Sequence, residues 1–409
     1  MNILKKEVFI MAKSISDPET KNVNIFLDNA STTRVDDRVY NEMLPYFYIY
    51  YGNASSLHSF GELPLERLEQ SRESCAGLIG SAADEIYFTS CGTESNNMAL
   101  WGIARAYREK GNHIITSAIE HYSILNPLKE MQKEGWEVTI LPVDSYGKID
   151  PGDLKKAIKN NTVLVSIMHA SNEIGTILDI KEISAVTKEA GILLHSDGVA
   201  TAGIIPVDVK SLGVDSYSFS SQQMYGPKGA AALYLKKGTK IRPLILGGTQ
   251  ESGRRAGTEN IPSIAGFGEA CRIAREELGS NAAQIQALRD RLIEGIGSSI
   301  KNVRLNGHPV QRLPGNVHMS FEYIEGESII LLLNSEGIAA ASGSSCASHA
   351  LKTSQVLLAI KLSPAIANGS ILFSIGKYNT KPEIEKVIGV LPVIVEKLRK
   401  MSPLCNLGK

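Results

Sequence analysis

Short apolar runs alternate with amphipathic stretches between about residues 86 and 235. Compact runs rich in β-branched and aromatic residues predict strands, and the segments between them predict helices or turns. The predicted strands are HIITS (113–117), WEVTILPV (136–143), TVLVSIMH (162–169), GILLHSD (191–197) and SYSFS (216–220). Strands interleaved with helices indicate a mostly parallel sheet covered on both faces. In such a sheet the ligand lies at the carboxyl ends of the strands.

The last third of the chain has a different pattern. It predicts a long charged helix over 263–300, a strand in NVHMSFEY (316–323), a helix near 326–335, a loop of small residues, a strand in GSILFSIG (369–376) and a final helix. This order is typical of a smaller α+β unit. We therefore expect an extension over 1–24, a large domain over 39–280, and a small domain made of 25–38 with 281–409.

Composition narrows the class of protein. The 409 residues include 43 basic and 43 acidic side chains, so the balanced charge gives no indication of a nucleic-acid partner. No apolar run approaches the roughly 20 residues of a membrane span, and the first 24 residues do not resemble a secretory signal. The five cysteines are scattered, which is typical of reduced thiols and predicts a cytoplasmic protein.

Polar residues follow several predicted strands. In FTSCGTESNNMAL (88–100), Gly92 and Thr93 make a turn before a helix that we expect to start with Glu94. The free amides at that helix start would suit a phosphate, although Ser and Thr there are also common as N-caps. Asp197 follows another strand, where it would hold a protonated heterocyclic nitrogen or cap the next helix. His121 also follows a strand, as catalyst or as structural hydrogen-bonder.

Asn172 and Glu173 in MHASNEIGT lie at a further strand end. Because these strand ends meet at one edge of the sheet, the polar groups together predict a single binding crevice. Separately, ASGSSCASHA (341–350) places Cys346 among small residues that offer little apolar cover. This favours an accessible, reactive thiol over a buried free cysteine.

Many segments, in order, resemble the NifS/IscS-like cysteine desulfurases, which have the class V aminotransferase fold and depend on pyridoxal 5'-phosphate (PLP). They are FLDNASTT, YGNASSLH, FTSCGTESNN, EHYSIL, MHASNEIGT, HSDG, YGPKGAAALYL, RRAGTEN, YIEGES, SGSSCAS and GKYNT. The resemblance covers about residues 25–404. It implies an α/β protein of PLP-dependent transferase fold type I, with a sheet of the seven-stranded type in the large domain and a smaller α+β domain.

The resemblance also implies roles. His121 would stack on the cofactor ring, Asp197 would pair with its nitrogen, and Asn172 would lie beside it. Groups expected to bind the phosphate are Gly92, Thr93, Ser220, Gln222 and, from a partner subunit, Thr258. Cys346 would attack the substrate sulfur and carry a persulfide, and its surroundings resemble the group that supplies iron–sulfur scaffold proteins of the IscU/NifU type. A homodimer is implied by the phosphate contact from the second subunit.

Four positions depart from the family pattern. Where the family has His-Lys before Tyr-Gly-Pro-Lys-Gly, the lysine forming the Schiff base with PLP, this chain has Gln222 and Gln223. Ala200 replaces a glutamine that contacts the cofactor, and Leu372 replaces the arginine that binds the substrate carboxylate. A primary amide cannot form an imine or shuttle protons as an amine does. We interpret the four changes as natural divergence toward a branch lacking the lysine, since a single change would suffice to trap an enzyme.

Three functions follow. In the first, the protein lacks ordinary desulfurase activity but serves iron–sulfur assembly, with Cys346 accepting sulfur from sulfide or a donor protein, or ligating a shared cluster. In the second, it is an enzyme that binds PLP without a covalent bond and acts on an amine or cysteine-like substrate. In the third, it is a non-enzymatic partner of an active desulfurase.

Overall fold

The computed structural model describes residues 25–342 and 353–403. Its largest sheet has seven strands in the order β2-β8-β7-β6-β5-β3-β4. Their bounds are β2 (Ile86–Thr89), β3 (His113–Ser117), β4 (Glu137–Leu141), β5 (Thr162–Ser166), β6 (Leu193–Asp197), β7 (Ser216–Ser220) and β8 (Ala231–Leu235). Only β8 runs antiparallel to its neighbours, β2 and β7. The predicted α/β fold with a mostly parallel sheet is confirmed.

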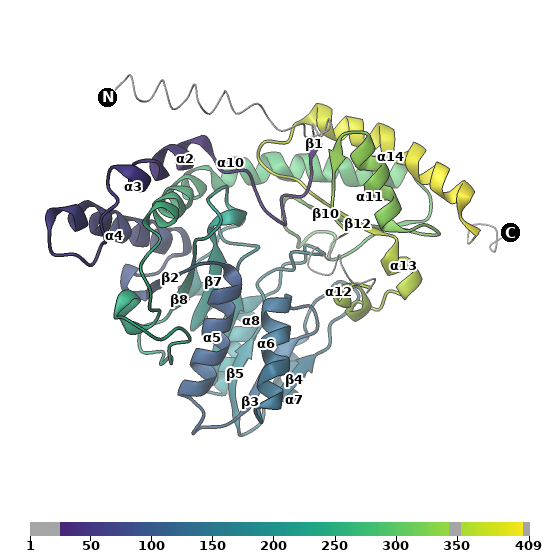
Figure 1. Cartoon of the computed structure of the whole chain (residues 1–409). Helices are drawn as coiled ribbons and strands as arrows, with labels where there is room; N and C mark the ends of the chain where they lie inside the picture. The colour runs from purple at the N-terminus through teal and green to yellow at the C-terminus, as the bar shows by residue number, and fades with distance from the viewer. Residues whose placement is uncertain (1–24, 343–352, 404–409) are drawn as a thin grey trace, which may run out of the picture.

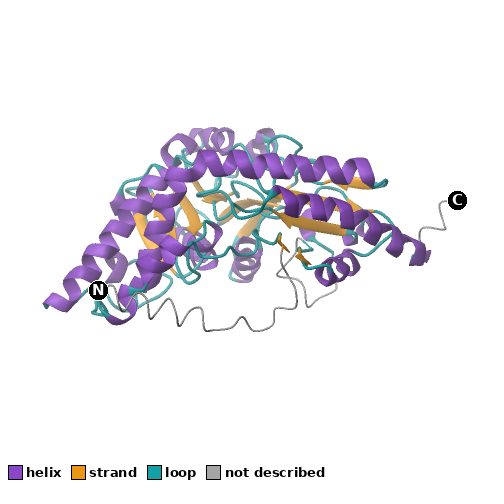
Figure 2. Cartoon of the chain, turned by 90° about the horizontal axis from the view of Figure 1, so that it is seen from above, coloured by secondary structure: helices purple, strands orange, loops and turns teal. Residues whose placement is uncertain are grey.

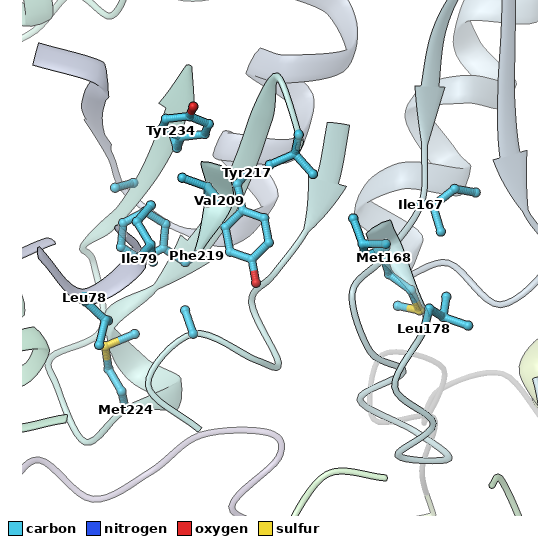
Figure 3. Close-up of a cluster of buried hydrophobic side chains, with 14 of the residues drawn as sticks. Leu78, Ile79, Ile167, Met168, Leu178, Val209, Tyr217, Phe219, Met224 and Tyr234 are labelled. Atoms are coloured by element: carbon cyan, nitrogen blue, oxygen red, sulfur yellow. The ribbon is translucent and has the colours of Figure 1, made fainter. Parts of the chain in front are cut away.

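Helices cover both faces of this sheet because successive strand residues point to opposite sides. Ile114 and Leu164 pack with α5 (Gly92–Ala106) and α6 (Tyr122–Lys133) on one side. The other face packs against α4 (Ser59–Ile79), α7 (Pro151–Ala157) and α8 (Ile180–Glu189). Figure 3 shows part of the core on this face of the large sheet, to which Tyr217 and Phe219 of β7 and Ile79 of α4 belong.

A second core lies under a smaller sheet of order β12-β10-β9. Its antiparallel strands are β9 (Val303–Leu305), β10 (Asn316–Phe321) and β12 (Ser370–Ser374). Their apolar face packs against α11 (Gly326–Ser335) and α14 (Lys381–Met401). The start of the described chain also lies here, because β1 (Ile25–Phe26) pairs in parallel with β11 (Ile338–Ala339).

The helix α10 (Ile261–Ser299) belongs to both cores. Its N-terminal half contributes Phe267 and Cys271 to the core of the large sheet, and its C-terminal half contributes Leu288 and Leu292 to the other. At about 1.5 Å per residue, 39 residues extend to roughly 58 Å. In Figures 1 and 2 this helix runs along one side of the molecule, from the region of α2 to α14.

The remaining elements are short. They are α2 (Asp37–Met43), α3 (Pro45–Tyr48), α9 (Val209–Leu212), α12 (Gln355–Ala359), α13 (Pro364–Asn368) and the 3-10 turns η1 (Ala83–Glu85), η2 (Ser221–Gln223) and η3 (Gln250–Gly253). None of the helices within residues 25–342 and 353–403 is long and apolar enough to cross a membrane.

Candidate functional site

Five parallel strands of the large sheet end at one cavity of about 330 Å³. Nine of the positions singled out in the sequence line it: Gly92, Thr93, His121, Asn172, Asp197, Ala200, Ser220, Gln222 and Gln223. The opposite walls come from α10, from residues 313–316, and from the end of β12 with the segment after it. The predicted convergence at the carboxyl ends of the strands therefore produces an enclosed site.

The start of α5 is an open anion cradle. This helix begins at Gly92, two residues before the predicted start, and no side chain caps it. Glycine is required because a Cβ there would lie 2.5 Å from Val199 Cγ2. The uncapped amides of the first turn and the positive end of the helix dipole suit a phosphate. Ser220, a buried cavity-lining residue, has no hydroxyl hydrogen bond within the described part of the chain, so it too is available to an anion.

Asp197 presents a carboxylate at the floor of the cavity. Asn96 Nδ2 donates to Asp197 Oδ2 at 2.7 Å, and Val199 N donates to Oδ1 at 3.0 Å. Burial raises the pKa of Asp197, while the nearby His121 opposes that rise. Sequence reasoning missed Asn96, although it lies one helical turn after Thr93 and so shares its face of α5.

His121 is oriented by the same network. Its Nδ1 accepts from Ser123 N at 3.1 Å and lies 2.8 Å from Ser123 Oγ. Because Asn96 Nδ2 donates to that hydroxyl at 2.8 Å, the hydroxyl proton is free to point at His121 Nδ1. This assignment puts the neutral ring's proton on Nε2. The imidazole is therefore fixed in position and tautomer beside the cavity.

The turn after β7 carries the two glutamines. The backbone oxygen of Gln222 accepts from Thr33 N at 3.2 Å and from Thr33 Oγ1 at 2.8 Å. The side chain of Gln223 donates through Nε2 to Ala30 O at 3.0 Å. Tyr225, held at φ 63°, donates its N–H to Thr33 Oγ1 at 3.0 Å. These hydrogen bonds thus hold the turn against the segment that follows β1.

A buried ion pair lies at one edge of the site. Lys377, which lines the cavity, places Nζ 2.6 Å from Asp36 Oδ2, and both side chains are less than a tenth exposed. Arg38 also binds Asp36, and these hydrogen bonds hold the pKa of the Asp36 carboxyl well below its usual range. No local pattern predicts this contact, because its partners lie 341 positions apart.

Three predicted residues lie away from this cavity. Thr258 is exposed and does not line it within this chain, while Leu372 is buried in β12. Glu173, next to Asn172, is also buried outside the lining, and its Oε1 accepts from Ser354 Oγ. Burial raises the pKa of Glu173 to about 7.

Cys346 lies outside the described residues. The residues that flank the segment 343–352 are nevertheless placed. Ala341 and Leu372 exchange backbone hydrogen bonds of 3.1 and 2.8 Å, and Ser354 binds Glu173. The flank before residue 343 thus bonds to Leu372, two residues before the cavity-lining Ser374. The flank after residue 352 bonds to Glu173, which follows the cavity-lining Asn172.

Another buried carboxylate, Glu120, gives a testable pH dependence. Glu120 is 3% exposed; its Oε1 accepts from Ser117 Oγ and Met168 N, and burial raises its pKa to about 8. Between about pH 4.5 and 8 the folded chain binds a proton that the unfolded chain releases, so stability falls as pH rises.

We expect Glu120→Gln to remove this dependence. Relative to the native chain, its free energy of unfolding should rise by about 4 kcal/mol between about pH 5 and pH 8.5. Urea unfolding at several pH values measures this difference. Parallel pH profiles of the two proteins would contradict it.

Comparison with known proteins identifies the family. The aminotransferase class-V family matches residues 25–387. The chain is 48% identical over 385 residues to the cysteine desulfurase IscS of Methanosarcina thermophila, covering 94% of this chain and 95% of the relative. It is 49% identical over 379 residues to the cysteine desulfurase IscS of Dictyoglomus turgidum, covering 93% and 96%.

Solved structures agree with these relatives. A NifS-like protein superposes with a TM-score of 0.86 at 37% identity, covering 91% of this chain and 100% of the other. A NifS-like protein from Rickettsia africae superposes with a TM-score of 0.82 at 30% identity, covering 91% and 99%. The chain belongs to the cysteine desulfurase family of class V aminotransferases.

Proposed function

We propose that this protein transfers sulfur in iron–sulfur cluster assembly through Cys346, without the lysine-dependent release of sulfur from free cysteine. The observation that carries the proposal is the cavity itself. It keeps an anion cradle, a buried carboxylate and an oriented histidine, but it has an amide at Gln223, which donates to Ala30 O. The relatives named cysteine desulfurase IscS support a role in mobilising sulfur for such clusters.

The cavity fits PLP as a non-covalent ligand. Gly92, Thr93, Ser220 and Gln222 would hold its phosphate, because the first turn of α5 is uncapped and the Ser220 hydroxyl is unpaired among the described residues. Asp197 would hold the ring nitrogen, with His121 and Asn172 beside the ring. When bound, PLP supplies an electron sink. Gln223 cannot condense with its aldehyde, since an amide nitrogen is not a nucleophilic amine.

The described cavity-lining residues offer no free cation to bind the carboxylate of an amino-acid substrate. Lys377 is the single Lys or Arg among the described cavity-lining residues, and Asp36 already neutralises it at 2.6 Å. Leu372 provides no charge. A desolvated carboxylate without a cation is costly. We therefore expect little release of sulfide from free cysteine.

Cys346 would receive sulfur from a donor protein by thiol–persulfide exchange. Its thiolate would attack the outer sulfur of a donor persulfide, forming Cys346–S–SH and releasing the donor thiolate. The same exchange passes the sulfur to a thiolate of an IscU/NifU-type scaffold, so no net oxidant is needed. The alternative role of Cys346 is to ligate a cluster shared with the scaffold, and that cluster would be cargo of the assembly and not a resident cofactor. Reduced thiols of this kind favour the cytoplasm as the site of action.

A homodimer is the expected assembly. Exposed apolar side chains gather on and beside α3 and α4, including Phe47, Tyr48, Tyr51, Leu57 and Phe60. A group of neighbouring exposed apolar side chains is typical of a protein–protein contact surface. Thr258 is exposed in the single chain, which leaves it available to the phosphate site of a second subunit.

Substitution of Cys346 tests the proposal. We expect Cys346→Ser to lose nearly all sulfur transfer from a persulfide donor to a scaffold, because serine cannot carry sulfane sulfur. Mass spectrometry of the protein detects the bound sulfur, and cluster absorbance on the scaffold measures transfer. Cys405→Ser serves as the matched control and should keep both signals. Unchanged transfer by Cys346→Ser would refute the proposed role.

A further inference from the structure

The side chain of Gln223 has a fixed direction. Its Nε2 donates to Ala30 O at 3.0 Å, and Ala30 is held in turn by Ser374 Oγ, which accepts from Ala30 N at 2.8 Å. Turning the amide over would place Oε1 against the carbonyl oxygen of Ala30, two acceptors face to face. One of the two N–H donors of Gln223 Nε2 is therefore already used within the protein, and this bond fixes the orientation of the amide.

The acceptor end of Gln223 is left for a ligand. Within the described residues no donor reaches Oε1, and the side chain lines the cavity. It follows Ser220 and Gln222 on the same turn, so a ligand held by the phosphate cradle lies within the same enclosure. An acceptor without a partner in such a site is satisfied best by a charged N–H donor.

The surroundings do not repel a cationic group. Lys377 carries its charge against Asp36 at 2.6 Å, and Leu372 adds none. Asp197 lines the same cavity but is assigned to the ring nitrogen, which both forms of the cofactor share. An ammonium group beside Gln223 Oε1 therefore meets an acceptor, whereas an aldehyde oxygen beside Oε1 would meet another oxygen.

We infer that this cavity selects the amine form of the cofactor, pyridoxamine 5'-phosphate, over the aldehyde form, with Gln223 Oε1 accepting a hydrogen bond from the ligand ammonium. Both forms share the same phosphate and ring. The contacts of Gly92, Thr93, Ser220 and Asp197 thus contribute equally to each, and the preference arises at position 223. The inference rests on the part of the proposed function that keeps the cofactor cradle.

Calorimetric titration of the full chain with the two phosphates separately is the test. We expect pyridoxamine 5'-phosphate to bind about 10-fold or more tightly than PLP, the usual effect of one hydrogen bond from a charged donor. Gln223→Met, similar in length and without an amide, should abolish the preference by weakening only the amine form. Gln223→Glu should enlarge it. Ser220→Ala should weaken both forms by a similar factor.

Equal binding of the two forms, tighter binding of PLP, or a preference that survives Gln223→Met would overturn the inference. So would the absence of binding by either form. That last outcome would also contradict the proposed cofactor cradle, whereas the other outcomes leave the cradle intact. Sulfur transfer through Cys346 is measured separately, so its failure and the failure of this inference are distinguishable.

Discussion

Gln223→Lys is expected to attach PLP covalently to the protein, in place of the reversible binding proposed for the native chain. The lysine ε-amine, placed on the turn that carries Ser220 and Gln222, would condense with the cofactor aldehyde and release water. Borohydride reduction followed by mass spectrometry would locate the cofactor on residue 223. The native chain, treated in the same way, should carry no cofactor at this position.

Attachment alone should not restore desulfurase activity. The combined variant Gln222→His, Gln223→Lys, Ala200→Gln and Leu372→Arg returns the proton-transfer groups and the carboxylate-binding cation together. We expect it to release sulfide from cysteine at least about 10²-fold faster than the native chain, the lower range of a general acid–base contribution. Its melting temperature must first show that arginine at the buried position 372 is accepted.

Two results would contradict this interpretation. Sulfide release by the native chain at a rate similar to that of the combined variant would show that Gln223 does not prevent the reaction. A folded combined variant that binds cofactor covalently yet stays inactive would show that the four positions are not what separates this chain from its active relatives.

Asp36→Ala should destabilise the protein by about 3–5 kcal/mol, the usual cost of breaking a buried ion pair by removing one partner. It removes the near partner of Lys377, whose side chain is 8% exposed and whose other carboxylate, Glu277, lies 4.0 Å away. It also removes the cap of α2, where Asp36 accepts from Arg38 N. Urea unfolding at fixed protein concentration measures the change.

Asp37→Ala is the matched control. Asp37 pairs with Arg34 at 2.8 Å, but both side chains are mostly exposed. Its loss should change stability by less than about 1 kcal/mol. Lys377→Met combined with Asp36→Ala should recover part of the loss, because the unpaired ammonium is gone. Equal effects of the two aspartate substitutions would argue that burial contributes nothing to the Asp36 pair.

The sequence was sufficient to predict the fold and the convergence of its polar strand-end residues on one cavity. The strands β3, β5, β6 and β7 were identified from local runs of apolar and β-branched residues, because strands buried on both faces of a parallel sheet have short, nearly continuous apolar sequences. Polar residues such as His121 and Asp197 just beyond those strands predicted one crevice, since parallel strands end at a common edge. Even the absence of a lysine at Gln223 was evident from the motif around it.

Tertiary structure alone determined what these residues do in the cavity. Gln223 meets Ala30 across 193 positions, and Lys377 meets Asp36 across 341, so no local pattern encodes either contact. The first contact orients the amide of Gln223, so that its Oε1 is left as an acceptor. The second pairs the charge of Lys377 with Asp36. The family and the changed turn are thus properties of the sequence. The direction in which Gln223 presents its amide is decided by a hydrogen bond that forms only after distant segments pack together.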